Sequence, residues 1–259
     1  MISKVIVESE VKNGITQLKS VFFNTPFKVV DIREDKKKPL LELILMSSSP
    51  GVLDGDELYF EYILNENSQL EITTQSFQRL FTMEKGAFQE TKVLIKENAF
   101  LSYLPHPSVP HKGSDFKSNN TIYLEKNASV LWGEIFTCGR KLKGEVFEFT
   151  KMQSLTKVYQ EDKLVFFENL YLNPSEFNPI NLGQLEGFTH QLSLFFLHQS
   201  IDVKKMKSEL DLFLKDKNCV FGISEAPANG LVIKILYNKA EKLMSWMKEI
   251  TKIIKQYGL

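Results

Sequence analysis

The sequence lacks the compositional features of several protein classes. Its 32 basic and 32 acidic residues cancel, so it has no basic excess of the kind that nucleic-acid-binding surfaces carry. The charged run Asp35–Lys38 precedes Pro39 and is typical of a solvated turn. No stretch approaches the roughly 20 apolar residues that a membrane-spanning helix requires. We therefore expect neither nucleic acid nor a membrane among the partners.

Cysteine is scarce, and no targeting segment is recognisable. The two cysteines, Cys138 and Cys219, lie far apart in the sequence. The first residues, Met1–Val7, alternate like a β-strand and do not form the apolar region of a signal peptide. Because disulfides belong mainly to oxidising compartments, we expect two free thiols and a cytoplasmic protein.

Signature motifs of common enzyme classes are also absent. There is no glycine-rich or Walker-type phosphate loop, no Gly-x-Ser-x-Gly turn and no His-Glu-x-x-His helix. His106 and His111 flank two prolines; we expect a solvated loop pair, and weak transition-metal ligation is the alternative. Neither cysteine has the close Cys or His neighbours of a structural zinc site. The sequence predicts no catalytic activity and no tightly bound metal or cofactor.

What the chain does have is β-strand character over most of its length. Leu58–Leu64, Lys92–Ile95 and Thr121–Leu124 are rich in β-branched and aromatic residues. The 43% hydrophobic fraction is enough for a sizeable core. We expect a mainly β fold whose body spans residues 1–180.

The β-rich part also repeats itself. Three times a β run ends at a charged residue, an asparagine and a small residue or serine, and a second β run follows. The asparagines, Asn67, Asn98 and Asn127, are 31 and 29 residues apart. Asparagine tolerates positive φ better than other non-glycine residues, so it suits tight turns between strands. A recurrence near 30 residues predicts similar hairpins stacked in register, in a layered or β-helical body.

After about residue 180 the sequence pattern changes from strand-like alternation to a mixture of helical and strand-like segments. Val203–Asp216 and Lys239–Tyr257 have apolar residues at helical spacing, and Val220–Ile223 and Leu231–Leu236 are typical of strands. We expect residues 181–259 to form a small α+β lobe packed on the body, with the Pro-, Asn- and Gly-rich segment 173–187 as the connector.

Polar residues lie within several of the strand-like segments. Burying such groups without a partner is costly, so they must bond to one another, to water or to a binding partner. The residues in question are Asp56, Thr74, Gln75, Glu134, Arg140 and Glu145.

Taken in order, short motifs across residues 20–190 resemble the urease accessory protein UreD family, called UreH in some bacteria. The motifs are Ser49–Gly51 with Gly55-Asp56, Thr73–Gln75, Asn98-Ala99 with Leu104–Pro107, Trp132–Ile135, Gly139-Arg140 and Gly144-Glu145. Gly187–His190 fits the UreH branch. Val52 departs from the pattern, because many relatives have a second glycine there, and this affects local turn geometry alone.

The resemblance implies a non-enzymatic role in urease maturation. Its members bind the urease apoprotein and the accessory protein UreF, and UreF docks the GTPase UreG. The assembly inserts nickel into urease, with GTP bound to UreG and not to this chain. A homodimer within the complex is a further expectation.

We hypothesise that the six polar residues above help form a water-filled path for nickel in transit. Scattered oxygen ligands would hold the ion weakly, whereas a His/Cys cage would trap it. The competing interpretation is that Arg140, Glu134 and Glu145 form a buried structural network. Two other functions stay open. One is a β-helical carbohydrate-active enzyme using Asp56, Glu134 and Glu145 as its acid/base set, and the other is a phage-type β-solenoid.

Overall fold

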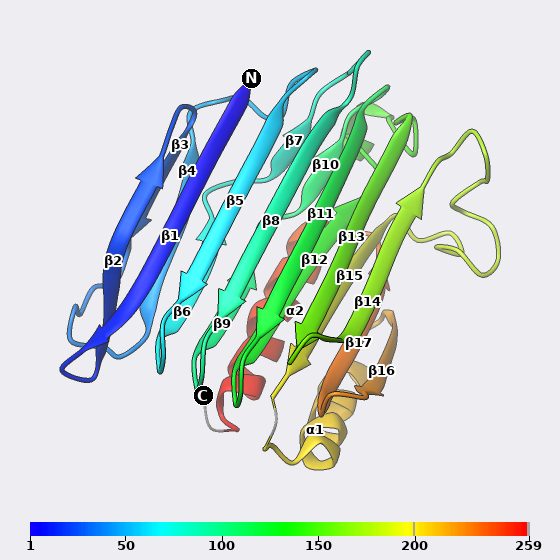
Figure 1. Ribbon diagram of the computed structural model, residues 1–259. Helices are drawn as coiled ribbons and strands as arrows, with labels where there is room; N and C mark the ends of the chain where they lie inside the picture. The colour runs from blue at the N-terminus through cyan, green and yellow to red at the C-terminus, as the bar shows by residue number, and fades with distance from the viewer. Residues whose placement is uncertain (199, 258–259) are drawn as a thin grey trace.

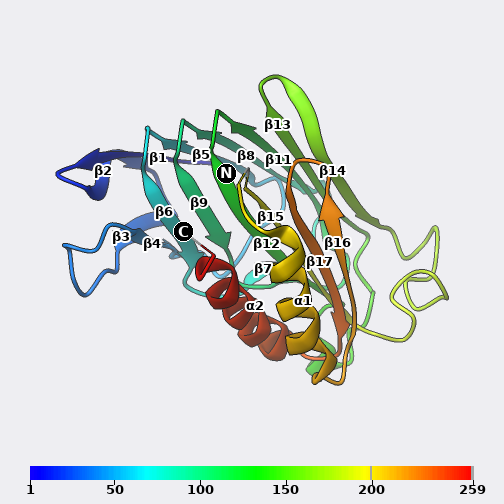
Figure 2. The ribbon, with the colours of Figure 1, turned by 90° about the horizontal axis from the view of Figure 1, so that it is seen from below.

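The computed structural model describes residues 1–198 and 200–257. Two β-sheets stack face to face, and two helices cover the outer face of one of them, which gives three layers (Figures 1 and 2). Within the described residues the first sheet, sheet A, has seven strands. In spatial order they are β14 (Lys163–Leu172), β13 (Lys151–Gln160), β11 (Asp115–Leu124), β8 (Ala87–Ile95), β5 (Glu57–Leu64), β1 (Ile2–Lys12) and β2 (Ile15–Phe23).

The second sheet, sheet B, lies between sheet A and the helices (Figure 2). Its main path runs through β16 (Val220–Ala226), β17 (Gly230–Tyr237), β15 (His190–Leu197), β12 (Ser129–Thr137), β9 (Phe100–Leu104), β6 (Gln69–Thr74), β4 (Leu41–Ser47) and β3 (Phe27–Asp31). Two short strands, β7 (Gln78–Leu80) and β10 (Ser108–Pro110), pair with each other, and β10 also pairs with β12.

The chain winds through the body as a coil that visits the two sheets alternately. It passes from β5 to β6, back to β8, then to β9, β11, β12 and β13. Successive visits to one sheet are parallel: β5 pairs with β8 and β8 with β11 in sheet A, and β6 pairs with β9 and β9 with β12 in sheet B. This arrangement confirms the predicted mainly β fold with a stacked, β-helical body.

The repeated asparagines lie at corresponding turns of this coil. Asn67, Asn98 and Asn127 all have positive φ, between 56° and 62°. The amide of Asn67 donates to the carbonyl of Glu97, one coil away, and the Asn98 amide donates to Lys126 in the same way. The Asn127 side chain donates to Asn98 Oδ1 at 3.2 Å. The left-handed turns therefore stack in register and align the strands that they join.

The C-terminal segment continues sheet B and then covers it. β15 pairs antiparallel with β12, and β17 pairs with β15, so these strands extend the sheet of the body. Helices α1 (Val203–Lys215) and α2 (Ala240–Lys255) pack on the outer face of sheet B (Figure 2). Gly133 lets α2 approach closely, because a Cβ there would lie 2.8 Å from Met247 Sδ.

Two apolar clusters form the core, one between the sheets and one between sheet B and the helices. Both cysteines are free thiols, as predicted. Among the described residues, neither helix is long and apolar enough to cross a membrane. The loop between β14 and β15, residues 173–189, projects from the side of the sandwich (Figure 1).

Candidate functional site

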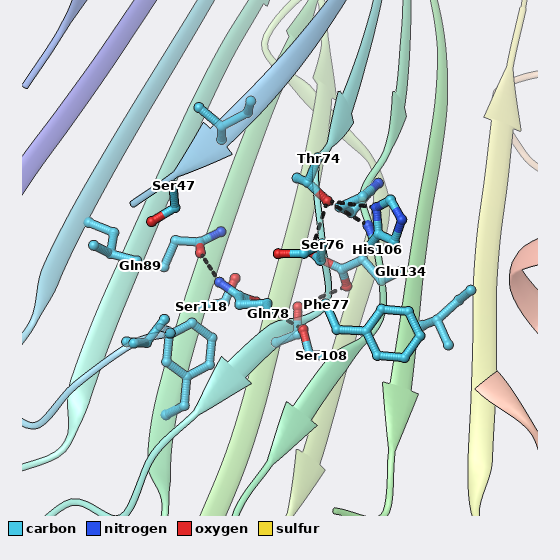
Figure 3. Close-up of a pocket in the computed structure, with 18 of the residues that line it drawn as sticks. Ser47, Thr74, Ser76, Phe77, Gln78, Gln89, His106, Ser108, Ser118 and Glu134 are labelled. Atoms are coloured by element: carbon cyan, nitrogen blue, oxygen red, sulfur yellow. Dashed lines mark hydrogen bonds between the residues drawn. The ribbon is translucent and has the colours of Figure 1, made fainter. Parts of the chain in front are cut away.

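A cavity of about 150 Å³ lies within the sandwich. The residues that line it reach from Pro26 and Ser47, at the end of the β3–β4 hairpin, to Glu168 on β14 and Ser193 on β15. The cavity therefore extends between the sheets from β14 and β15 to the β3–β4 hairpin. Figure 3 shows polar side chains from several strands pointing toward it.

Sheet A contributes two adjacent rows of polar side chains that face sheet B. Gln89, Ser118 and Ser154 lie side by side on β8, β11 and β13. The second row, two residues further along each strand, is Thr91, Asn120, Thr156 and Glu168. Apart from Glu168, which is half-buried, all of these side chains are buried. The parallel register brings residues of like polarity together, because equivalent positions of successive coils lie next to each other.

Glu134 faces these rows from β12. Asn120 Nδ2 donates to its Oε1 at 3.0 Å, and Ser154 Oγ donates to its Oε2 at 2.9 Å. Asn120 also donates to Thr156 Oγ1 at 2.9 Å. Glu134 is not fully covered by protein atoms, because it lines the cavity. Removal from bulk water raises the pKa of Glu134, and the hydrogen bonds from Ser154 and Asn120 oppose that rise.

An ion pair stands at the β14 side of the cavity. Glu134, Ser193 and Lys234 occupy directly opposed positions on β12, β15 and β17. Lys234 Nζ contacts both Glu168 Oε1 and Ser193 Oγ, and Ser193 Oγ donates to Glu168 Oε2 at 2.8 Å. Burial lowers the pKa of Lys234 to about 8, and the negative charge of Glu134 acts in the opposite direction. The Lys234 side chain is still 37% accessible, so this end of the polar row lies near solvent.

The opposite side of the cavity is lined mainly by neutral polar groups. Thr74 Oγ1 accepts a hydrogen bond from the backbone N–H of His106 at 2.8 Å and lies 3.2 Å from His106 Nδ1 (Figure 3). Gln78 donates to Gln89 Oε1 at 2.9 Å (Figure 3). Burial lowers the pKa of His106, and the Lys248 charge adds to this effect. This side of the cavity is therefore polar, and Asp56 is the one carboxylate among the described residues that line it there.

The structure places the six predicted site residues in two groups. Asp56, Thr74, Gln75 and Glu134 line the cavity. Asp56 also has a structural partner on each oxygen, because it accepts from the Met1 amino group at 2.9 Å and from the Leu53 amide at 2.8 Å.

Arg140 and Glu145 do not line the cavity. They form an ion pair with each other across the short 3-10 turn Lys141–Lys143, and Glu145 also accepts from the Lys112 amide at 3.2 Å. The Arg140 guanidinium lowers the pKa of Glu145. Because Asp56, Glu134 and Glu145 have separate partners, they do not converge as an acid/base set.

The expectation that His106 and His111 form a solvated pair is wrong. His111 is buried with its ring edge-on to Phe81, at 4.8 Å between ring centroids. His106 is half-buried at the cavity. In the part of the chain that the structure describes, no three His, Cys, Asp or Glu side chains form a group that could hold a metal ion.

Sequence reasoning missed most of the polar rows. The missed residues are Gln89, Thr91, Ser118, Asn120, Ser154, Thr156, Glu168, Ser193 and Lys234. A usable signal existed in the alternation within β11, where Ser118 and Asn120 share a face with the buried Phe116 and Ile122. Polar residues at core positions of a strand indicate a buried hydrogen-bond network or a cavity.

The fold and the cavity define a β-helical protein whose polar interior lacks, among the described residues, a metal cluster. Comparison with known proteins then identifies the family. The family model for the UreD urease accessory protein matches residues 3–259. The urease accessory protein UreD of Flavobacterium johnsoniae is 42% identical over 252 residues, covering 96% of this chain and 91% of that protein.

Two further relatives are also named urease accessory proteins. The urease accessory protein UreH of Helicobacter hepaticus is 33% identical, with 92% of each chain covered. The urease accessory protein UreD of Acetivibrio thermocellus is 31% identical, with 97% of each covered. The chain belongs to the UreD family of urease accessory proteins, as the motifs predicted. Its role is in urease maturation, and it is an accessory protein and not an enzyme.

Proposed function

We propose that this protein is a cytoplasmic scaffold that binds the urease apoprotein and UreF, and UreG through UreF, and that nickel on its way to urease passes through the cavity. The observation that carries the nickel part of this proposal is the polar interior of the sandwich. Thr91, Asn120 and Thr156 are at most 3% accessible, yet they occupy the centre of a β core. Apolar side chains would fill this space without any need for hydrogen bonds, so a requirement other than stability is needed to explain the polar ones.

The chemistry of the lining suits a divalent cation in transit. Hydroxyl, amide and carboxylate oxygens are spread along the cavity, from Thr74 through Glu134 to Glu168. Such groups can replace part of a hydration shell without enclosing the ion, and the described residues offer no cluster that would trap it. Arg140 and Glu145 lie outside this path, so the proposal no longer includes them.

The edge of sheet A supports the partner-binding part of the proposal. Strand β2 exposes three consecutive large apolar side chains, Val21, Phe22 and Phe23, and Ile2 on the neighbouring β1 is 66% exposed. Long apolar edge strands invite pairing or aggregation unless another protein covers them. A binding protein provides a reason to keep such an edge.

Glu134→Gln tests the nickel path. The amide keeps the size of the side chain and removes the one charge that faces the polar rows from β12. Expressed with urease and its other accessory proteins, we expect the variant to lower nickel content and urease activity roughly tenfold, the effect of about 1.4 kcal/mol. Co-purification with UreF and apo-urease should be unchanged. Glu90→Gln is the matched control, because Glu90 lies on the outer face of sheet A, where it pairs with Lys92.

Two outcomes would overturn the proposal. Normal nickel content in Glu134→Gln, with the complex intact, would show that nickel does not depend on this carboxylate. Loss of the complex in Glu134→Gln but not in Glu90→Gln would show that Glu134 holds the fold or an interface together.

A further inference from the structure

A lysine ammonium contacts Glu168 and Ser193, two of the side chains that line the β14 side of the cavity. Lys234 Nζ lies against Glu168 Oε1 and is 2.5 Å from Ser193 Oγ. Ser193 is itself bonded to the second oxygen of Glu168 at 2.8 Å. A carboxylate beside a hydroxyl is a set of ligands that would serve a hydrated divalent cation, and here a positive group of the protein itself contacts both of them.

The net charge at the β14 side of the cavity depends on Lys234. Glu134 and Glu168 both line the cavity, from β12 and β14. Glu134 bonds to the neutral side chains of Asn120 and Ser154, and the neutral Thr156 lies opposite Glu168 on the neighbouring strand. With Lys234 present, one of the two negative charges is compensated. Without it, two carboxylates in a partly buried site would attract a divalent cation strongly, because Coulomb interactions are weakly screened away from bulk water.

We propose that Lys234 is an internal counter-ion that competes with a divalent cation for Glu168 and Ser193, and so keeps occupancy of this end of the cavity short-lived. This inference rests on the proposed passage of nickel through the cavity. It adds a reason why a path lined by carboxylates would release its cargo. A cation arriving at Glu168 displaces the ammonium, and the returning ammonium displaces the cation.

The position of Lys234 allows this exchange. Its side chain is 37% accessible, and β17 is the penultimate strand of sheet B, so the ammonium can swing toward water without repacking the core. Lysine combines a compact charge with a flexible four-carbon stem. An arginine at this position would bind Glu168 through two hydrogen bonds and would dissociate from it less readily than lysine does.

Lys234→Met, measured in the complex purified with UreF, tests the competition. The variant keeps most of the aliphatic stem and removes the charge. We expect nickel ions to be retained about tenfold more tightly than in the wild type in equilibrium dialysis. The double variant Lys234→Met/Glu168→Gln should return to wild-type retention, because both members of the pair are gone. Lys151→Met is the matched control, since Lys151 pairs with Asp115 at 3.0 Å and neither residue lines the cavity.

A second measurement needs no substitution. Lysine acetylation of the wild-type complex, read by mass spectrometry with and without nickel ions, reports whether the ammonium leaves Glu168. We expect nickel to increase modification of Lys234 several-fold, and modification of Lys151 to stay constant.

Unchanged nickel retention in a folded Lys234→Met protein would overturn the competition, and so would nickel-independent acetylation of Lys234. Either result would leave the Glu134→Gln test of the path itself unaffected, so the two proposals fail separately.

Discussion

The two faces of sheet B are built differently. The face toward the helices is apolar at its centre, where Leu131, Ile135 and Leu194 pack against Met247 and Ile250 of α2. The face toward sheet A begins with the aromatic pair Tyr103 and Trp132, stacked at 4.1 Å, and then turns polar. The polar row on that face is Glu134, Ser193 and Lys234.

One strand makes the contrast plain, because consecutive residues of β12 point to opposite faces. Leu131, Gly133 and Ile135 contact the helix layer, whereas Trp132 and Glu134 face the other sheet. The helix layer supplies close apolar packing, which stabilises the fold. The inter-sheet layer accepts polar groups that need partners or water. We infer that the helices secure the sandwich and leave its interior free for polar side chains.

The largest expected effect comes from the apolar face. Ile250 is fully buried between α2 and sheet B, so Ile250→Ala should lower the free energy of unfolding by about 2–5 kcal/mol through lost burial and the cavity that remains. Denaturant unfolding with the UreF-type partner absent measures it. Leu212→Ala on α1 is the matched control, because Leu212 is 68% exposed. Equal losses at both positions would contradict the role given to the helix layer.

The next largest effect is a loss of folding stability at low pH. His190 begins β15 on the helix-facing side and is 6% accessible, with Thr189 Oγ1 at 2.8 Å from its Nδ1. Burial, assisted by the Lys141 charge, lowers the pKa of His190 to about 4. Below about pH 6.5, the usual histidine pKa, His190 is protonated in the unfolded chain but stays neutral in the folded chain. The free energy of unfolding therefore falls as the pH drops toward 4. The loss should total about 3 kcal/mol.

His190→Gln should flatten this pH dependence, because glutamine does not titrate. Unfolding free energies at pH 7 and pH 4.5 for the wild type and the variant give the comparison. The same slope in both proteins would assign the acid sensitivity to other groups.

The smallest effect is expected in the polar interior. Ser118 is 5% accessible and lines the cavity, and its hydroxyl lies 3.5 Å from Asn120 Oδ1, a long hydrogen bond. Ser118→Ala should change the unfolding free energy by less than about 0.5 kcal/mol, because the hydrogen bond that is lost is long and therefore weak. A loss as large as that of Ile250→Ala would mean that the polar rows are packed as tightly as the helix layer.

Local signals in the sequence predicted the body of the fold. The Asn67, Asn98 and Asn127 turns, with their β flanks, gave the stacked arrangement, and apolar spacing gave both helices to within two residues at each end. The free cysteines and the family also followed from the sequence. These features depend on short stretches of chain, so a single sequence contains enough information to predict them.

The site was predicted only in part. Glu134 and Thr74 were predicted as site residues because they are polar residues within strand-like segments of the sequence. Both line the cavity. Glu168 and Lys234 were not predicted, since they come from strands that the sequence cannot bring together: β14 and β17 belong to different sheets and are 66 positions apart at this contact. Arg140 and Glu145 looked equivalent to Glu134 in sequence but pair with each other on a turn. Long-range pairing, which decides such cases, was not visible in the sequence.

The register that the asparagine turns set between successive coils determines how the gene can change without disrupting the fold. Within β11, Ser118 and Asn120 face the interior and Lys117 and Asn119 do not, so losing one codon just before this strand would exchange the two sets. The same slip would bring Lys117 into the core and carry Ile122 to the surface. A gene for this protein can therefore change the cavity one side chain at a time by substitution, whereas a single-codon deletion in a coil would alter the cavity and the core together.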